Sequence, residues 1–158
     1  MKIKEQIDKK LSVDDDGVLT ETPLEGYELD NEIATQAVRY FLERWRKKYK
    51  KSLRHWFVTE LGHTNTERIH IHGFVWTDKP KEELAKIWKY GRMSIGYRTY
   101  DPNGKAINKG NTGFVSKQSI NYVVKYVTKT DLKHKEYKPK ILTSAGIGNA
   151  NFIPSVPR

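Results

Sequence analysis

The chain has no cysteine, no long apolar run and no phosphate-binding loop of the form Gly-x-x-x-x-Gly-Lys-Ser/Thr. The absence of cysteine excludes disulfides and thiolate metal sites, and it is typical of proteins in a reducing cytoplasm. No signal peptide and no apolar stretch of about 20 residues is present, so we expect a cytoplasmic protein without membrane contact. Without the phosphate-binding loop, the chain carries no ATP-driven helicase. Internal repeats and low-complexity tracts are absent as well.

Acidic residues are also scarce, because 19 Asp and Glu stand against 29 Lys and Arg for a net charge of +10. Such a balance favours a partner with a phosphate backbone. The positive charge gathers in two runs interleaved with aromatic residues, which could hold phosphates while stacking bases. The candidate nucleic-acid-binding residues are Arg44, Arg46, Lys47, Lys48, Lys50 and Lys51 in the first run and Lys133 and Lys135 in the second. A charge run can equally be the solvated face of a helix.

The apolar periodicity predicts one domain of the α+β class. We expect a central antiparallel sheet with helices packed on it, and an active site on the sheet face beside a helix that carries two tyrosines. A first helix is predicted from a cap at Asp30 to about Lys51, and a second from Pro80 to Gly91. Residues 92–100 are predicted to form a strand and residues 101–104 a turn.

Composition also suggests how the chain is divided. Residues 1–29 are predicted to be a polar leader and a candidate for a mobile segment, because they contain an acidic run, a glycine and a proline. Residues 30–148 are predicted to form the main domain, and residues 149–158 a tail. A chain of 158 residues is long enough to bury a sizeable core.

Two histidines near the middle of the chain indicate a metal site. His70 and His72 lie two residues apart on a predicted strand, so both rings project from the same face and can reach one cation. The strand at 55–61 precedes them, and residues 62–67 read as the turn of a hairpin. A three-residue loop at 64–66 would place Glu60 directly opposite His70. The sequence therefore predicts a three-ligand site of Glu60, His70 and His72 with open positions for water and substrate.

This prediction depends on the register of the hairpin. A two-residue loop would put Glu60 on the face opposite the histidines. His63 and Glu67, near the turn, are reserve ligands. A His-x-His strand can also be a pair of half-exposed polar residues on a solvated sheet face.

The segment 116–130 has helical periodicity. An apolar stripe of Ile120, Val123, Val124 and Val127 is expected to face the core, while Tyr122, Lys125, Tyr126 and Lys129 fall on the far side. The two tyrosines are spaced i, i+4, roughly 6 Å apart, so they could serve one site alternately. Because a phenol with a pKa near 10 is a poor nucleophile at neutral pH, the lysines would favour the phenolate and steady the charge on a phosphate. The alternatives are an amphipathic helix with tyrosines on its polar face, or a β-branched strand.

Together these motifs resemble those of the HUH endonucleases, in particular the rolling-circle replication initiators of microviruses, the single-stranded DNA phages and prophages of Bacteroidales. The likeness runs from about Gly26 to Gly148, and it rests on Phe57-Val-Thr-Glu-Leu-Gly62, His70-Ile-His-Gly73, Tyr122-x-x-Lys-Tyr-x-x-Lys129 and Ser144-Ala-Gly-Ile-Gly148. It implies an endonuclease that nicks and rejoins single-stranded origin DNA with Mg²⁺ or Mn²⁺, leaving a free 3′-hydroxyl and a 5′-phosphotyrosine.

By position, the resemblance implies ligand roles for Glu60, His70 and His72 and nucleophile roles for Tyr122 and Tyr126. Host helicase and polymerase would be partners in the cytoplasm of a bacterial cell. Such initiators usually begin their sheet with a hydrophobic, Thr-rich strand, and the candidate at 17–22 is short and acidic. Either this strand is missing or another segment replaces it.

Two other classes stay open. Metal enzymes of the double-stranded β-helix type also use His-x-His strands, but the helical stripes argue against that fold. A non-catalytic module that binds single-stranded nucleic acid through an exposed aromatic sheet would explain Trp56, Trp76 and the charge. A metal-dependent covalent protein–DNA adduct would separate the endonuclease from both classes.

Overall fold

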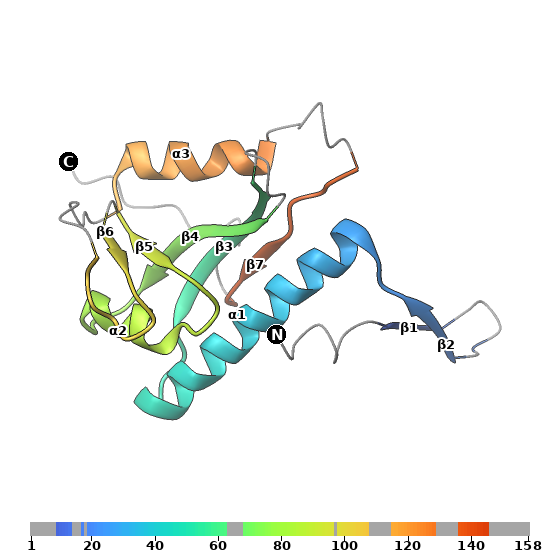
Figure 1. The fold of residues 1–158 in the computed structure, drawn as a ribbon, viewed down its shortest axis with the longest axis horizontal. Helices are drawn as coiled ribbons and strands as arrows, with labels where there is room; N and C mark the ends of the chain where they lie inside the picture. Colours follow the sequence, from blue (N-terminus) through green and yellow to red (C-terminus); the bar gives the residue numbers. More distant parts are fainter. Residues whose placement is uncertain are drawn as a thin grey trace.

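The computed structural model describes residues 9–13, 17, 19–62, 68–96, 98–107, 115–128 and 136–145. Its elements are β1 (Lys9–Val13), β2 (Leu19–Pro23), α1 (Gly26–Tyr49), β3 (Arg54–Leu61), β4 (Ile69–Trp76), α2 (Lys81–Ile87), β5 (Met93–Ile95), β6 (Arg98–Tyr100), α3 (Lys117–Thr128) and β7 (Ile141–Thr143). The predicted α+β class is confirmed. A three-stranded antiparallel sheet in the order β4-β3-β7 carries helices on both of its faces (Figure 1). Among the described residues, no helix is long and apolar enough to span a membrane.

The β3–β4 hairpin has the predicted register. Every residue of β3 has a partner in β4, from Arg54 opposite Trp76 to Leu61 opposite Ile69, and Glu60 lies opposite His70. The ladder continues beyond the strands, because the Gly62 N–H donates to the carbonyl oxygen of Arg68 at 2.9 Å. The tip of the turn, with the reserve ligands His63 and Glu67, lies outside the described residues.

One face of this sheet packs against α1 and forms the larger part of the core. Phe57 and Val75 project from the strands onto a buried cluster whose members come from α1, α2 and the segment between α1 and β3. The cluster consists of Phe41, Trp45, Leu53, Leu84 and Ile87. The apolar stripe of α1 therefore serves the purpose for which helical periodicity selects it.

The prediction that α1 begins at an Asp30 cap was wrong. The helix begins at Gly26, and Glu25 occupies the N-cap position without a side-chain cap hydrogen bond. Leu24 is buried, and Gly26 has a φ of 54°, a left-handed conformation that glycine adopts readily. The buried leucine and the glycine set the start of the helix one turn before the aspartate. At the other end, Lys50 has a φ of 55° and its N–H donates to the Arg46 carbonyl oxygen at 2.8 Å.

Residues 92–100 form two short strands rather than the single predicted strand. β5 and β6 pair antiparallel around Gly96, which has a φ of 60°. The glycine was the overlooked signal, because a left-handed residue between two short extended stretches favours a hairpin. The second helix follows Pro80 as predicted but ends at Ile87. The turn at 101–104 is confirmed, since the Gly104 N–H donates to the Asp101 carbonyl oxygen at 2.9 Å.

The third strand of the main sheet comes from the C-terminal part of the chain. β7 pairs with β3, with Ile141 opposite Val58, and the Ser144 N–H donates to the His55 carbonyl oxygen at 3.0 Å. Most of the N-terminal candidate for the first strand belongs to β2, which pairs with β1 in a separate two-stranded sheet (Figure 1). Within the described ranges, another segment thus supplies the strand that the N-terminal segment does not. The domain boundary predicted at residue 30 falls inside α1, and the division of the chain stays a prediction.

Candidate metal centre beside a tyrosine helix

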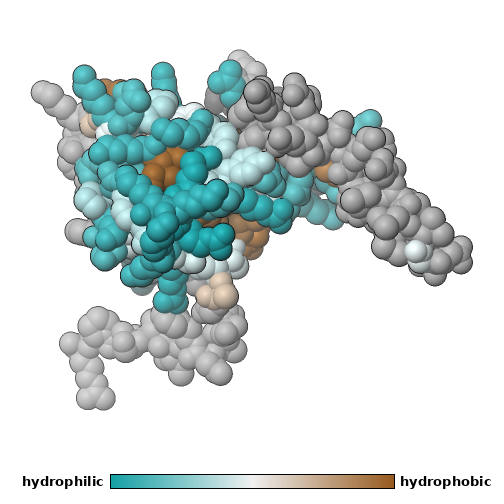
Figure 2. All heavy atoms as spheres, turned by 90° about the horizontal axis from the view of Figure 1, so that it is seen from below, coloured by the Kyte–Doolittle hydropathy of each residue, from teal (hydrophilic) through white to brown (hydrophobic). Residues whose placement is uncertain are grey.

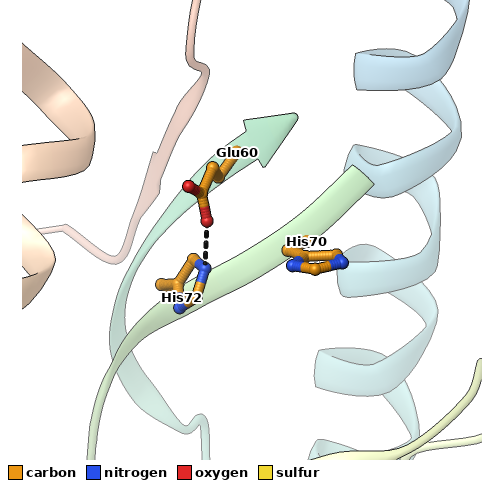
Figure 3. Close-up of side chains that lie close together, drawn as sticks. All are labelled: Glu60, His70 and His72. Atoms are coloured by element: carbon orange, nitrogen blue, oxygen red, sulfur yellow. Dashed lines mark hydrogen bonds and ion pairs between the residues drawn. The ribbon is translucent and has the colours of Figure 1, made fainter. Parts of the chain in front are cut away.

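The hairpin places Glu60, His70 and His72 together on the sheet face opposite α1 (Figure 3). One ligand atom from each of the three residues lies within 4.8 Å of the others. His72 Nε2 and Glu60 Oε2 are 2.7 Å apart and share a hydrogen bond. Glu60 and His72 are mostly covered, with side chains 13% and 25% exposed, whereas His70 is exposed. The three predicted ligands therefore form one constellation that is open to solvent on the His70 side.

The donor set suits a divalent cation. Two imidazole nitrogens and one carboxylate oxygen are ordinary metal ligands, and three protein ligands leave positions for water and substrate. Two ligand atoms that each bind one ion at about 2.1 Å and at right angles lie about 3 Å apart. The 2.7 Å between His72 Nε2 and Glu60 Oε2 needs to open by only a few tenths of an ångström to reach that geometry.

Two glycines explain why the strands can approach so closely around the ligands. A Cβ atom on Gly73 would overlap the carbonyl oxygen of Trp56 and lie 2.6 Å from Cδ1 of Phe57. A Cβ atom on Gly62 would lie 3.2 Å from Nε2 of His70. Any larger residue at Gly73 would push β4 away from β3, and with it the two histidines.

α3 is confirmed as a helix, and it lies over the same sheet face as the ligands (Figure 1). The predicted inward stripe, however, was wrong. Ile120 and Val124 are each 44% exposed and Val127 is 38% exposed, whereas Val123 and Tyr126 are buried against Val58 of β3. Tyr126 can face inward because its ring is apolar while its hydroxyl can reach the polar ligand cluster.

Both tyrosines of α3 contact His72. The ring of Tyr126 stacks on the imidazole with centroids 4.3 Å apart and planes 13° apart, and the ring of Tyr122 approaches it edge-on at 6.5 Å. The tyrosine rings are 5.4 Å from each other. Lys125 Nζ lies 3.8 Å from the centroid of the Tyr122 ring and 5.0 Å from that of Tyr126. The candidate nucleophiles, one ammonium group and the candidate ligands thus lie together.

The two tyrosines differ in environment. Tyr122 is 52% exposed, whereas Tyr126 is 6% exposed. Burial, a hydrogen bond with Tyr122 and the negative charge of Glu60 raise the pKa of Tyr126 above its ordinary value. Of the two hydroxyls, that of Tyr122 is therefore the more accessible to a substrate.

The first basic run lies at the C-terminal end of α1, at the bottom of Figure 1 and away from α3. Figure 2, which views the molecule from below, shows a mostly hydrophilic surface with small apolar patches. Arg44 is used within the fold, since it donates to the Ile87 carbonyl oxygen and the Tyr90 hydroxyl, and Lys48 pairs with Glu83. The other basic residues of the run, Arg46, Lys47, Lys50 and Lys51, are exposed. Lys129, Lys133 and Lys135 lie outside the described residues.

A buried hydrogen-bond network behind the site was not predicted. The Thr59 hydroxyl donates to Asn31 Oδ1 at 2.7 Å, and it accepts from the Tyr137 hydroxyl at 2.9 Å and the Lys140 N–H at 2.8 Å. Thr59 is fully buried beside Glu60, on the α1 side of the sheet. No local pattern announces such a network, because its partners lie 28 to 81 residues away in sequence.

A protein-family model for the replication-associated proteins of the ORF2 group matches residues 19–131. The match includes α1, the hairpin with its three candidate ligands and the whole of α3. No curated protein and no solved structure matches the chain.

Proposed function

Because the chain belongs to this family of replication-associated proteins, we propose that it is an initiator endonuclease of the HUH type. Family membership supports a role in DNA replication and contact with DNA. The finer proposal is that the protein nicks and rejoins single-stranded origin DNA in rolling-circle replication, as the microvirus initiators that it resembles are expected to do. One observation carries it: the rings of Tyr122 and Tyr126 lie against His72 of the candidate metal centre.

In this proposal Glu60, His70 and His72 hold a divalent cation, Mg²⁺ or Mn²⁺. When bound, the ion supplies neutralisation of the negative charge that builds up on the scissile phosphate. The carboxylate and the two neutral imidazoles orient the DNA at the open side, where His70 is exposed. Lys125, above both tyrosine rings, adds a second positive charge at the same place.

Tyr122 is the proposed first nucleophile, because its ring is half exposed and lies beside the candidate ligands. Its phenolic oxygen forms a bond to phosphorus, and the bond from phosphorus to the 3′ oxygen breaks. The phenolic proton leaves to solvent, and the 3′ oxygen takes up a proton to become a free hydroxyl that can prime synthesis. The other product is a 5′-phosphotyrosine. Attack by a 3′-hydroxyl on this phosphotyrosine reverses the chemistry and rejoins the strand.

Tyr126 is the proposed nucleophile of the second transfer, because its ring lies 5.4 Å from that of Tyr122 and contacts the same histidine. In a bacterial cytoplasm, host helicase and polymerase would provide unwinding and synthesis. The exposed lysines and arginines of the first basic run, together with Lys133 and Lys135, would add contacts to phosphates outside the cleavage site.

The test is covalent labelling of the protein by DNA. Labelled single-stranded oligonucleotides tiled across the replicon that encodes the protein are incubated with Mn²⁺ or with a chelator and resolved by denaturing electrophoresis. We expect a Mn²⁺-dependent adduct with the wild type and with Tyr40→Phe, a matched control on α1, and no adduct with the Tyr122→Phe/Tyr126→Phe double variant. A double variant that is still labelled would exclude the tyrosine mechanism. DNA binding without any adduct would support the non-catalytic module instead.

A further inference from the structure

The sheet face that carries the candidate ligands continues well beyond them. Alternation along β3 and β4 puts four successive cross-strand pairs on this face. In order from the ligands, the pairs are Glu60 with His70, Val58 with His72, Trp56 with Phe74, and Arg54 with Trp76. Six residues along an extended strand span about 20 Å, so the last pair lies about that far from the first.

The two pairs farthest from the ligands are aromatic and cationic. The rings of Trp56 and Phe74 lie nearly parallel, with centroids 6.2 Å apart and planes at 25°. Trp76 is 50% exposed, and the guanidinium carbon of Arg54 lies 5.5 Å from the centroid of its ring. A stacked aromatic pair would stabilise any antiparallel sheet. An exposed tryptophan beside an arginine, in line with that pair and with the ligands, goes beyond what sheet stability requires.

We propose that this strip, made of Trp56, Phe74, Trp76 and Arg54, binds the single-stranded DNA that flanks the scissile phosphate, with bases stacked on the aromatic rings and a phosphate held by Arg54. The proposal rests on the endonuclease function proposed above, because it takes the ligand cluster as one end of the DNA path. About 20 Å corresponds to about six nucleotides at the 3.4 Å spacing of stacked bases, and to fewer in an extended strand.

Three observations favour single-stranded DNA as the occupant. The strip is continuous with the candidate ligands on one sheet face, so a strand held at the phosphate can reach it without leaving the sheet. Flat rings and one guanidinium suit unpaired bases and a backbone phosphate, whereas paired bases keep their faces inside the duplex. The net charge of +10 and the replication-associated family both favour a nucleic-acid partner.

The experiment measures DNA affinity separately from cleavage. Fluorescence anisotropy with labelled (dT)20, in a chelator and on the full chain, compares the wild type with Trp76→Leu and Trp76→Phe. Leucine keeps an apolar side chain but removes the aromatic face, so we expect Trp76→Leu to weaken binding about tenfold and Trp76→Phe to retain most of the affinity. Lys89→Gln is the control for charge, because this exposed lysine follows α2 on the other side of the sheet. It is expected to bind like the wild type.

A second variant tests the phosphate contact. Arg54→Gln should reduce the slope of log affinity against log salt by about 0.7, the value for one phosphate on a single strand, whereas an unchanged slope would remove Arg54 from the strip. Equal affinity of Trp76→Leu and the wild type for (dT)20 would overturn the stacking proposal. A loss of the same size on a duplex of equal length would overturn its single-stranded assignment.

Failure of the strip and failure of the nuclease are distinguishable. Wild-type affinity of Trp76→Leu together with a Mn²⁺-dependent adduct on origin DNA would reject the strip and keep the nuclease. A tenfold loss of affinity together with no adduct from the wild type would keep the strip as a binding surface and reject the nuclease.

Discussion

The two faces of the β3–β4 hairpin are built in different ways. Toward α1, side chains are buried, close-packed and hydrogen-bonded, as around Phe57 and the hydroxyl of Thr59. Toward α3, a small buried group of Val58, Val123 and Tyr126 separates partly exposed aromatic residues from the candidate ligands. The difference suggests a division of labour, in which the α1 face supplies stability and the α3 face can keep polar groups available for a substrate.

The largest expected effect is loss of activity on the α3 face without loss of fold. Replacing His70 or His72 by alanine removes one of three ligands, so cleavage of single-stranded DNA should fall by at least about 100-fold. The thermal unfolding midpoint without metal should stay close to that of the wild type, because neither side chain belongs to the buried core. Undiminished cleavage by both variants would remove the metal centre from the account.

Glu60→Ala sharpens this prediction. If the register places the carboxylate in the ligand set, this variant should be as inactive as the histidine variants and should bind Mn²⁺ more weakly in isothermal titration. Full activity of Glu60→Ala would transfer the third ligand role to Glu67 or His63.

On the α1 face the largest expected effect is on stability. Phe41 is 2% exposed and packs in the main cluster, so Phe41→Ala should lower the free energy of unfolding by about 3–5 kcal/mol. Urea denaturation followed by circular dichroism measures this loss. Val124→Ala, at an exposed apolar position of α3, is the contrast and should cost well under about 1 kcal/mol. Similar losses for the two variants would end the distinction between the faces.

A smaller loss is expected from the network behind Glu60. Thr59→Val keeps the shape of the side chain but leaves Asn31, Tyr137 and the Lys140 N–H without the Thr59 hydroxyl, at a cost of about 1–3 kcal/mol. Thr59→Ser keeps the hydroxyl and should lose less. If serine and valine destabilise the protein equally in urea, packing of the methyl group, rather than the network, is what matters.

The smallest expected effect concerns acid stability on the α1 side. Hydrogen bonds from Lys48, Tyr49 and Lys86 lower the pKa of Glu83 to about 2. A carboxyl whose folded pKa is depressed stabilises the protein above its unfolded pKa, near 4.3, and this contribution is lost as the pH falls toward the folded value. Glu83→Gln should therefore melt below the wild type at pH 7, and the gap should narrow between pH 5 and pH 2. A gap that stays constant with pH would exclude this linkage.

The hairpin and its ligands could be predicted from sequence because a period of two and a short turn leave few registers. Glu60 opposite His70 followed from counting along the ladder. The inward face of α3 could not be predicted in the same way, because periodicity alone places valine and isoleucine inside and tyrosine outside. Tyr126 reverses that expectation, since its ring packs on His72 while its hydroxyl stays near Glu60 and Tyr122.

The placement of β7 and the Thr59 network could not be predicted for a different reason. β7 has three residues, too few for a periodic signal, and its position depends on pairing with a strand more than 80 residues earlier. Thr59 looks like an ordinary strand residue, and only the folded chain brings Asn31, Tyr137 and Lys140 to its hydroxyl. Long-range contacts of this kind leave no mark within a single segment.

The most direct test of the central claim is to identify the residue that becomes linked to DNA. The Mn²⁺-dependent adduct is digested with nuclease and protease, and mass spectrometry locates the phosphonucleotide. The account predicts linkage to Tyr122 in the wild type, loss of the first-cut adduct in Tyr122→Phe, and an adduct that forms but releases no circle in Tyr126→Phe. First-cut linkage to Tyr126, or to a residue outside α3, would contradict it.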